Sequence, residues 1–281
     1  MNVSRKNRIN AVILRVVVYI AAVLTVLTLL ALIGFILVKG IPNITPEQFE
    51  WNYTTENVSM MPAIINTIIM TALTLVVAVP LGVFSAVYLV EYAGRGNRVV
   101  RLIRLTTETL QGIPSIVFGL FGFLFFVVFL GWGLSLLAGM MTLSLMILPV
   151  IMRTTEEALK AVSDSYREGS FGLGAGKLRT VFRVVIPAAR QGILSGIILG
   201  IGRIVGETAA LIYTAGTVTG IAASPFYSGR TLSVHMYALL SEGLFIKQAY
   251  ATAVVLLVVV ILINAASAWL AGRFAGKEQN D

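Results

Sequence analysis

Residues 168–187 read EGSFGLGAGKLRTVFRVVIP, and residues 200–211 read GIGRIVGETAAL. The first stretch is charged and rich in glycine, which is typical of an exposed turn between helices. The second stretch is apolar except for Arg203, Glu207 and Thr208. The sequence therefore predicts a loop that engages a soluble partner, followed by a membrane helix that meets an anion.

The composition of the whole chain is that of a membrane protein. Of its 281 residues, 57% are hydrophobic and only 12% are charged. The mean hydropathy is +0.90, far outside the range of soluble proteins. We therefore predict an all-α membrane protein.

Charge-free runs predict six transmembrane helices, since about 20 apolar residues cross the hydrocarbon layer. The runs lie between Arg15 and Lys39, between Glu56 and Glu91, between Glu108 and Arg153, from Pro187 to about Thr214, and between Lys247 and Arg273. The third run is long enough for two helices, and Gly131-Trp132-Gly133 marks the hairpin between them. Pro80 lies inside the second helix, where neighbouring helices must cover the carbonyl that it leaves free.

The distribution of basic residues predicts the orientation. Of the 21 Lys and Arg residues, 17 fall on one side of the six helices. They lie in the amino-terminal tail, in residues 95–104, in residues 153–190 and in the carboxyl-terminal tail. The positive-inside rule places both termini in the cytoplasm. The net charge of +8 follows from topology, so no nucleic-acid partner is expected.

Signatures of an enzyme or a metal site are missing from the sequence. The chain has no cysteine and one histidine, His235, which we expect to be a hydrogen-bonding residue of an outer loop. Residues 172–177, GLGAGK, resemble a phosphate-binding loop, but Phe171 and Leu178 stand where that loop needs Gly and Ser or Thr. We expect no nucleotide site in this chain.

The segment between the fourth and fifth predicted helices, residues 153–190, has a helical pattern of its own. Glu156, Glu157 and Lys160 have the spacing of ion pairs on a helix that continues out of the membrane. Ser163 is suited to cap a second helix, which Gly172, Gly174 and Gly176 then end. Pro187 fits the first turn of the next helix. A solvated connection with ordinary basic residues is the alternative.

Part of this segment resembles the EAA loop of ABC importer permeases. That loop has the pattern EAA, three residues, Gly, nine residues and I-x-L-P. The same spacing is found here in Glu168-Gly169-Ser170, Gly174 and residues 184–187, VVIP. Small residues replace the two alanines of the pattern, and apolar residues replace its Ile and Leu. The resemblance implies that Glu168, Gly169, Ser170 and Gly174 form a coupling helix that docks on an ATPase subunit.

Four further motifs resemble the phosphate-importer permeases within this family. They are YLVEY at residues 88–92, GIPSIVFG at 112–119, RTTEE at 153–157 and GETA at 206–209. The resemblance covers about residues 60–270 and implies a type I permease core over residues 60–273. Residues 1–59 then form a tail, the first helix and an outer loop, and residues 274–281 form a cytoplasmic tail.

Arg203 and Glu207 are the candidate substrate-binding residues. A charge in the bilayer is costly, so both should face a protein interior or an aqueous path, and on one helix their spacing places them on one face. A structural ion pair is the alternative. We hypothesise that Arg203 donates to phosphate oxygens and that Glu207 restrains Arg203 and accepts a P–OH hydrogen bond.

Small residues precede this pair at a spacing of four. Gly192, Gly196 and Gly200 predict close packing of the fifth helix against a neighbour.

The resemblance also implies the partners of the chain. They are a PstC-like second permease, an ABC ATPase dimer that carries ATP and Mg²⁺, and an extracytoplasmic phosphate-binding protein in a bacterial inner membrane. The chain itself would hold no cofactor and would be a transport subunit and not an enzyme. Alternatives are a permease for molybdate or sulphate, an intramembrane enzyme without a visible catalytic dyad, and a channel that would have no use for the docking loop.

Overall fold

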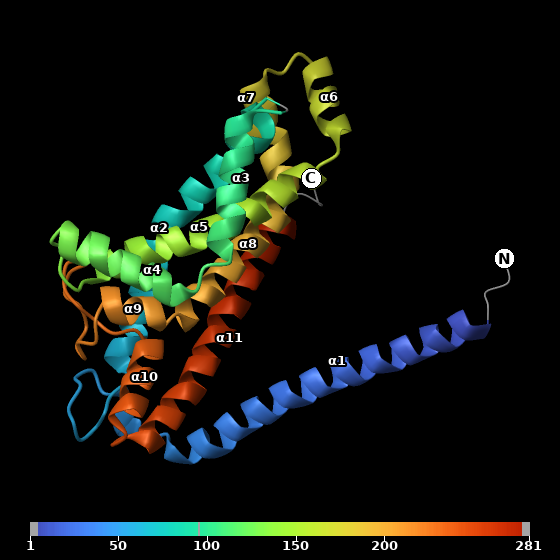
Figure 1. The fold of residues 1–281 in the computed structure, drawn as a ribbon. Coiled ribbons are helices and arrows are strands. Elements are labelled where there is room, and N and C mark those ends of the chain that lie inside the picture. The colour runs from blue at the N-terminus through green and yellow to red at the C-terminus, as the bar shows by residue number, and fades with distance from the viewer. Residues whose placement is uncertain (1–4, 95, 277–281) are drawn as a thin grey trace.

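The computed structural model describes residues 5–94 and 96–276 and contains no strand in these ranges (Figure 1). The α-helices are α1 (Arg5–Gly40), α2 (Met61–Val87), α3 (Arg98–Gln111), α4 (Ser115–Gly122), α5 (Leu136–Ala161), α6 (Asp164–Gly172), α7 (Lys177–Thr180), α8 (Ile186–Gly206), α9 (Ala209–Thr214), α10 (Leu232–Glu242) and α11 (Ile246–Gly276). Three π-helical turns, Tyr88–Tyr92, Phe123–Phe129 and Val181–Val185, follow α2, α4 and α7. Arg95, Lys277 and most of the predicted tail at 274–281 lie outside the described residues.

Within the described residues, five helical segments are long and apolar enough to cross a membrane. They are Ala11–Asn43, Met61–Tyr92, Leu136–Ala161, Lys177–Gly206 and Ile246–Trp269. A sixth crossing exists only if α3 and α4, which meet at an angle of 105°, are counted as one broken span. The predicted all-α membrane architecture is confirmed, but the third predicted span is not a straight helix.

The break in the third span has a local cause. α3 ends at Gln111, and Pro114, which has no N–H to donate, caps the start of α4 at Ser115. The hairpin that was predicted at residues 131–133 is confirmed. Gly131 and Gly133 both have positive φ, 69° and 65°, a conformation that glycine adopts without steric cost.

The core lies between α2 and α5, with contributions from α8 and α9. Its fully buried side chains include Met70, Leu143, Met146 and Ile147. Because lipid tails are as apolar as these side chains, close packing and not the exclusion of water holds the helices together.

α8 lies against α5 through two of the three predicted small residues. A Cβ at Gly192 would stand 2.5 Å from the Cβ of Ala158, and a Cβ at Gly196 would overlap the hydroxyl of Thr154. At Gly200 the nearest atom, on Ile151, would be 3.8 Å away. The close approach of α8 to α5 therefore needs glycine at positions 192 and 196. At position 200 a Cβ would meet α5 at an ordinary contact distance.

The fifth span differs from its prediction at both ends. The chain is helical from Lys177 through the π-helical turn into α8, so the span begins before Pro187, which lies in the first turn of α8 as predicted. A π-helical turn just before a proline accommodates the missing N–H. The span also ends at Gly206 and not near Thr214, because the backbone at Glu207 is extended, with φ −71° and ψ 127°.

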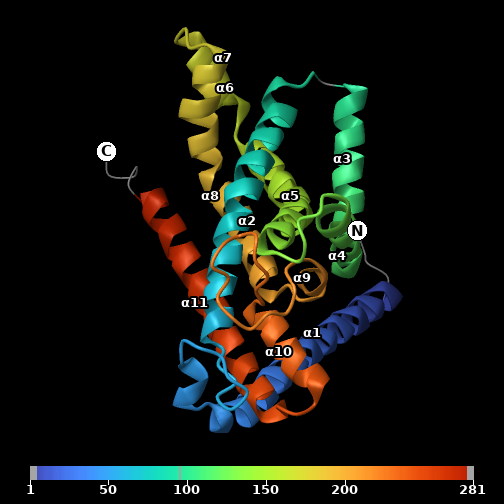
Figure 2. The same cartoon turned by 90° about the vertical axis from the view of Figure 1, so that its left-hand side faces the viewer.

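α1 extends away from the bundle at an angle from the lower end of α11 (Figures 1 and 2). It touches α11 near its carboxyl end, where the rings of Phe35 and Tyr250 meet edge to face at 5.9 Å. The apolar window that qualifies it as a span is entirely unburied. Lipid or another subunit must cover this helix.

Candidate functional site

The predicted coupling segment forms a helix and a turn at one end of the bundle, opposite α10 (Figures 1 and 2). Ser163 caps α6, and its side chain accepts a hydrogen bond from the backbone N–H of Ser165. α6 ends at Gly172, and Gly174 has φ 82°. The hydroxyls of Ser170 and Thr180 lie 2.9 Å apart, so the side chain of Ser170 connects α6 to α7.

The tip of this segment is apolar and exposed. Leu173 is 91% exposed, and Tyr166, Phe171 and Leu178 are also exposed. Glu168 and Gly169 lie on the exposed surface of α6, and a Cβ on Gly169 would meet no atom within 4 Å. An exposed apolar tip on a projecting helix is typical of a surface that a partner covers.

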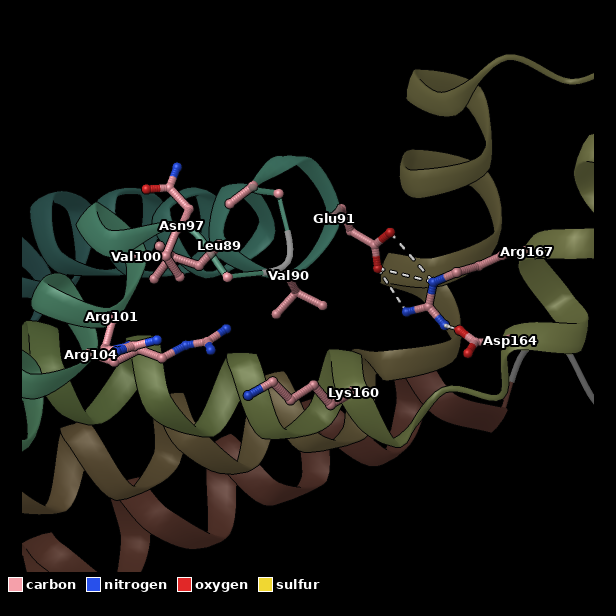
Figure 3. Close-up of a pocket in the computed structure, with 13 residues that line it drawn as sticks. Leu89, Val90, Glu91, Asn97, Val100, Arg101, Arg104, Lys160, Asp164 and Arg167 are labelled. Carbon is pink, nitrogen blue, oxygen red and sulfur yellow. Dashed lines mark hydrogen bonds and ion pairs between the residues drawn. The ribbon is translucent and has the colours of Figure 1, made fainter.

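An ion pair holds α6 to the end of α2. Figure 3 shows the guanidinium of Arg167 facing the carboxylate of Glu91. Nη2 of Arg167 lies 2.7 Å from Oε1 of Glu91, and Nε lies 3.1 Å from the same oxygen. Only 14% of the Arg167 side chain and 8% of the Glu91 side chain are exposed. The pair is therefore shielded from solvent, unlike most surface ion pairs.

Arg167 also binds the loop between α5 and α6. It donates to the carbonyl oxygens of Val162 at 2.8 Å and Leu159 at 3.0 Å, and to Asp164 at 3.2 Å. The pKa of Arg167 is raised above its ordinary value, mainly by the hydrogen bond to Glu91. One side chain thus connects α2, the end of α5 and α6.

This pair is not evident from the sequence, because Glu91 and Arg167 lie 76 residues apart. Two local signals point to it in retrospect. Glu91 is the charge that ends the second apolar run, and Arg167 directly precedes Glu168. A second contact joins the turn after α2 to α7, since Nζ of Lys177 lies 5.2 Å from the ring centre of Tyr92.

Arg203 and Glu207 do not share a helix face, and this expectation was wrong. Arg203 lies in the last turn of α8, whereas Glu207 lies beyond its end. No ion pair joins them among the described residues. The carboxylate of Glu207 accepts the N–H of Ala210 at 3.0 Å, and its carbonyl oxygen accepts the hydroxyl of Ser233 at 2.6 Å. In this structure Glu207 stabilises the break between α8 and α9.

Arg203 instead lines an open groove between α5, α8 and α11. The groove has a volume of about 660 Å³, and Gly202, Leu199, Val150 and Asn264 line it with Arg203. The carbonyl oxygen of the Asn264 side chain is buried and has no hydrogen-bond partner in the described structure. A guanidinium and an unpaired amide oxygen thus lie at one groove. Asn264 was missed, although a lone amide in an apolar span is itself a signal.

A comparison with protein families matches residues 78–277 to the binding-protein-dependent transport system inner membrane components. The chain belongs to this family. The match includes α6, α8 and α11 and thus every predicted coupling and substrate-binding residue of this permease. It is therefore a subunit of a multi-pass membrane transport system.

Individual relatives are similar over most of the permease. It is 34% identical over 89% of its length to a probable ABC transporter permease protein, YqgI, of Bacillus subtilis, covering 91% of that protein. It is also 34% identical over 81% of its length to the phosphate transport system permease protein PstA 1 of Mycobacterium tuberculosis, covering 72% of that protein.

Solved structures share the fold of the permease at low identity. A chain of a bacterial alginate ABC transporter, in complex with an alginate-bound periplasmic protein, matches with a TM-score of 0.70 and 13% identity, covering 96% of this chain and 98% of the other. A chain of the inward-facing MetNI methionine ABC transporter matches with a TM-score of 0.58 and 20% identity, covering 76% of this chain and 94% of the other. The type I ABC importer fold is thus confirmed.

The one histidine of the permease lies buried in a helix and not in an outer loop, contrary to expectation. His235 lies in α10, is 0% exposed, and neither ring nitrogen has a hydrogen-bond partner in the described structure. Its ring meets the ring of Tyr53 edge to face at 6.2 Å, and the guanidinium of Arg230 stacks on Tyr53 at 4.8 Å. Burial, and secondarily the charge of Arg230, lower the pKa of His235 to about 3.

This lowered pKa predicts a loss of stability in acid. The unfolded chain protonates His235 near pH 6.5, whereas the folded chain resists protonation until about pH 3. Stability should therefore be complete above pH 6.5 and decline as the pH falls, by up to about 2 kcal/mol between pH 7 and pH 5. Thermal unfolding of the wild type and His235→Phe at both pH values tests this. Between pH 7 and pH 5 the variant should lose less stability than the wild type. Equal losses in the two proteins would contradict a lowered pKa of His235 in the folded chain.

Proposed function

We propose that this chain is one permease subunit of an ATP-driven phosphate importer in a bacterial inner membrane. It would pair with a PstC-like second permease, receive phosphate from an extracytoplasmic binding protein and dock on an ABC ATPase dimer that holds ATP and Mg²⁺. Similarity to PstA proteins supports phosphate as the substrate. The excess of basic residues near α6 supports a cytoplasmic location for both termini.

The observation that carries the coupling role is the exposed tip of α6. Leu173, which directly follows α6, is 91% exposed, and Arg167 connects α6 to the end of α2. When ATP closes the ATPase dimer, a force on α6 would reach α2 through this ion pair. Nucleotide bound to a partner would thus supply the free energy for alternating access.

Polar groups on the exposed surface of α8 support a translocation path shared with a second permease. Gln191 and Ser195 are exposed on this helix, and Arg203 is partly exposed. Polar side chains in a membrane helix are expected to face protein or water and not lipid. A second permease on this side would cover the groove at Arg203 and complete the path.

Arg203 and Asn264 can recognise a protonated oxyanion. The planar guanidinium of Arg203 can donate two hydrogen bonds to phosphate oxygens. The unpaired oxygen of Asn264 can accept a hydrogen bond from P–OH, which phosphate carries near neutral pH and sulphate does not. Asn264 would thereby take the role first expected of Glu207, whose carboxylate already binds the first turn of α9.

Uptake by the complete complex in vesicles tests this site. We expect Arg203→Ala to lower phosphate uptake about 30-fold, since hydrogen bonds to charged groups contribute about 1.5–3 kcal/mol. Arg203→Lys keeps the charge but loses the planar fork, and should retain an intermediate rate. Uptake at the wild-type rate by the Arg203→Ala variant would show that Arg203 does not bind the transported anion.

A further inference from the structure

A basic cavity lies beside the coupling helix, at the end of α2. It has a volume of about 650 Å³ and lies between residues 93, 94, 96 and 97, α3, the end of α5 and the start of α6. Arg101, Arg104, Lys160 and Arg167 line it, against two acidic residues, Glu91 and Asp164. We call this space the basic cavity. Figure 3 shows the side chains of Arg104 and Lys160 extending into the space between α3 and α5.

The positive charges of the basic cavity are only partly neutralised. Nε of Arg104 and Nζ of Lys160 share one oxygen of Glu156, at 2.7 and 2.6 Å. Arg101 is exposed and forms no ion pair within the described residues. Donors therefore outnumber acceptors at this cavity, which suits an anion with several oxygens.

An apolar groove adjoins the basic cavity and shares Leu89 with it. The groove has a volume of about 410 Å³ and runs between α2 and α3, where Leu81, Phe84, Tyr88 and Ile103 line it. Leu81, Phe84 and Tyr88 are each more than half exposed. The exposed rings of Tyr88 and Tyr92 at this boundary are typical of the level of lipid headgroups.

We propose that the basic cavity and the apolar groove together bind one anionic phospholipid. The phosphate of the headgroup would lie between Arg101, Arg104 and Lys160, and an acyl chain would lie along the groove. A soluble phosphate would use the cavity but leave the groove empty. The assignment to the cytoplasmic leaflet rests on the proposed function, but binding itself does not.

The position of this lipid would link the membrane to coupling. The pair of Glu91 and Arg167 forms one wall of the basic cavity. A bound headgroup would fill the space between α3 and that wall and limit the movement of α6 toward α3.

Native mass spectrometry of the full transport complex, without ATP or a transported anion, tests the proposal. The complex is stripped of lipid and offered equal amounts of phosphatidylglycerol and phosphatidylcholine. We expect preferential retention of phosphatidylglycerol, and a loss of this preference by about ten-fold in Arg101→Gln/Lys160→Gln. Arg98→Gln/Arg183→Gln removes the same charge at exposed positions outside the cavity and should keep the preference.

A second pair of variants separates a lipid from a soluble phosphate. Ser85→Trp fills the groove, whereas Val76→Trp places the same side chain on α2 at an exposed position outside it. Loss of phosphatidylglycerol in Ser85→Trp alone would support the proposal. The proposal would be overturned if Arg101→Gln/Lys160→Gln retained phosphatidylglycerol fully. It would also be overturned if excess inorganic phosphate displaced phosphatidylglycerol while Ser85→Trp had no effect on its retention. Because the assay measures no transport, a failed phosphate-importer assignment would leave this result intact.

Discussion

Replacing Arg167 with methionine is expected to destabilise the junction of α2 and α6 by about 3–5 kcal/mol, because it leaves the carboxylate of Glu91 shielded without its cation. The substitution also removes the donors that bind the carbonyl oxygens of Leu159 and Val162. Amide hydrogen exchange within α6 should accelerate by about 100-fold or more. ATP hydrolysis by the complex should no longer depend on the transported anion.

Arg153→Met is the matched control for this prediction. Arg153 pairs with Glu157 at 3.0 Å, but 52% and 64% of the two side chains are exposed. An exposed pair of this kind contributes about 0.5 kcal/mol or less. Equal exchange rates in α6 of both variants would contradict the role of Arg167 as the connection between α2 and α6.

Replacing Leu173 with aspartate should abolish stable docking of the ATPase. Docking would bury the new carboxylate without a partner, which costs about 2 kcal/mol or more, so the dissociation constant should rise about 30-fold or more. Because Leu173 is 91% exposed in this chain, the variant should fold normally. Titration of the purified ATPase against the permease pair measures the effect.

Two further variants make the docking test specific. Leu244→Asp places the same charge at a residue that is 80% exposed after α10, at the opposite end of the bundle, and should leave ATPase affinity unchanged. Gly169→Leu projects into open space in this chain and should block docking, whereas Gly169→Ala should not. Normal affinity in both Leu173→Asp and Gly169→Leu would place the ATPase elsewhere.

Local chemistry accounts for what the sequence predicted correctly. Ser163 caps a helix because its short side chain reaches a backbone N–H, and Gly174 permits the left-handed turn after α6. The membrane helices follow from long runs without charge, since lipid admits few alternatives to a helix. These features depend on neighbouring residues and not on the tertiary arrangement.

The errors arose where helix continuity was assumed. The expected face shared by Arg203 and Glu207 requires one unbroken helix, and no proline warns of the break after Gly206. Thr208 and Ala209 instead begin a new helix whose first turn Glu207 stabilises. The 105° bend between α3 and α4 was missed because the charge-free run alone defined the span.

Contacts between distant segments were outside the reach of a single sequence. The pair of Glu91 and Arg167 and the groove shared by Arg203 and Asn264 each join different helices. Pairing depends on how α2, α6, α8 and α11 pack, which periodicity does not specify. His235 illustrates the same limit, because its burial depends on Tyr53 in a separate loop.

The most direct measurement of the central claim is ATP hydrolysis by the complex reconstituted in lipid with its ATPase, second permease and binding protein. The reaction is titrated with phosphate, sulphate and molybdate in parallel. The account predicts stimulation by phosphate alone, and its loss in Arg203→Ala. Equal or greater stimulation by sulphate or molybdate would contradict both the substrate and the proposed role of Asn264 as acceptor of a P–OH hydrogen bond.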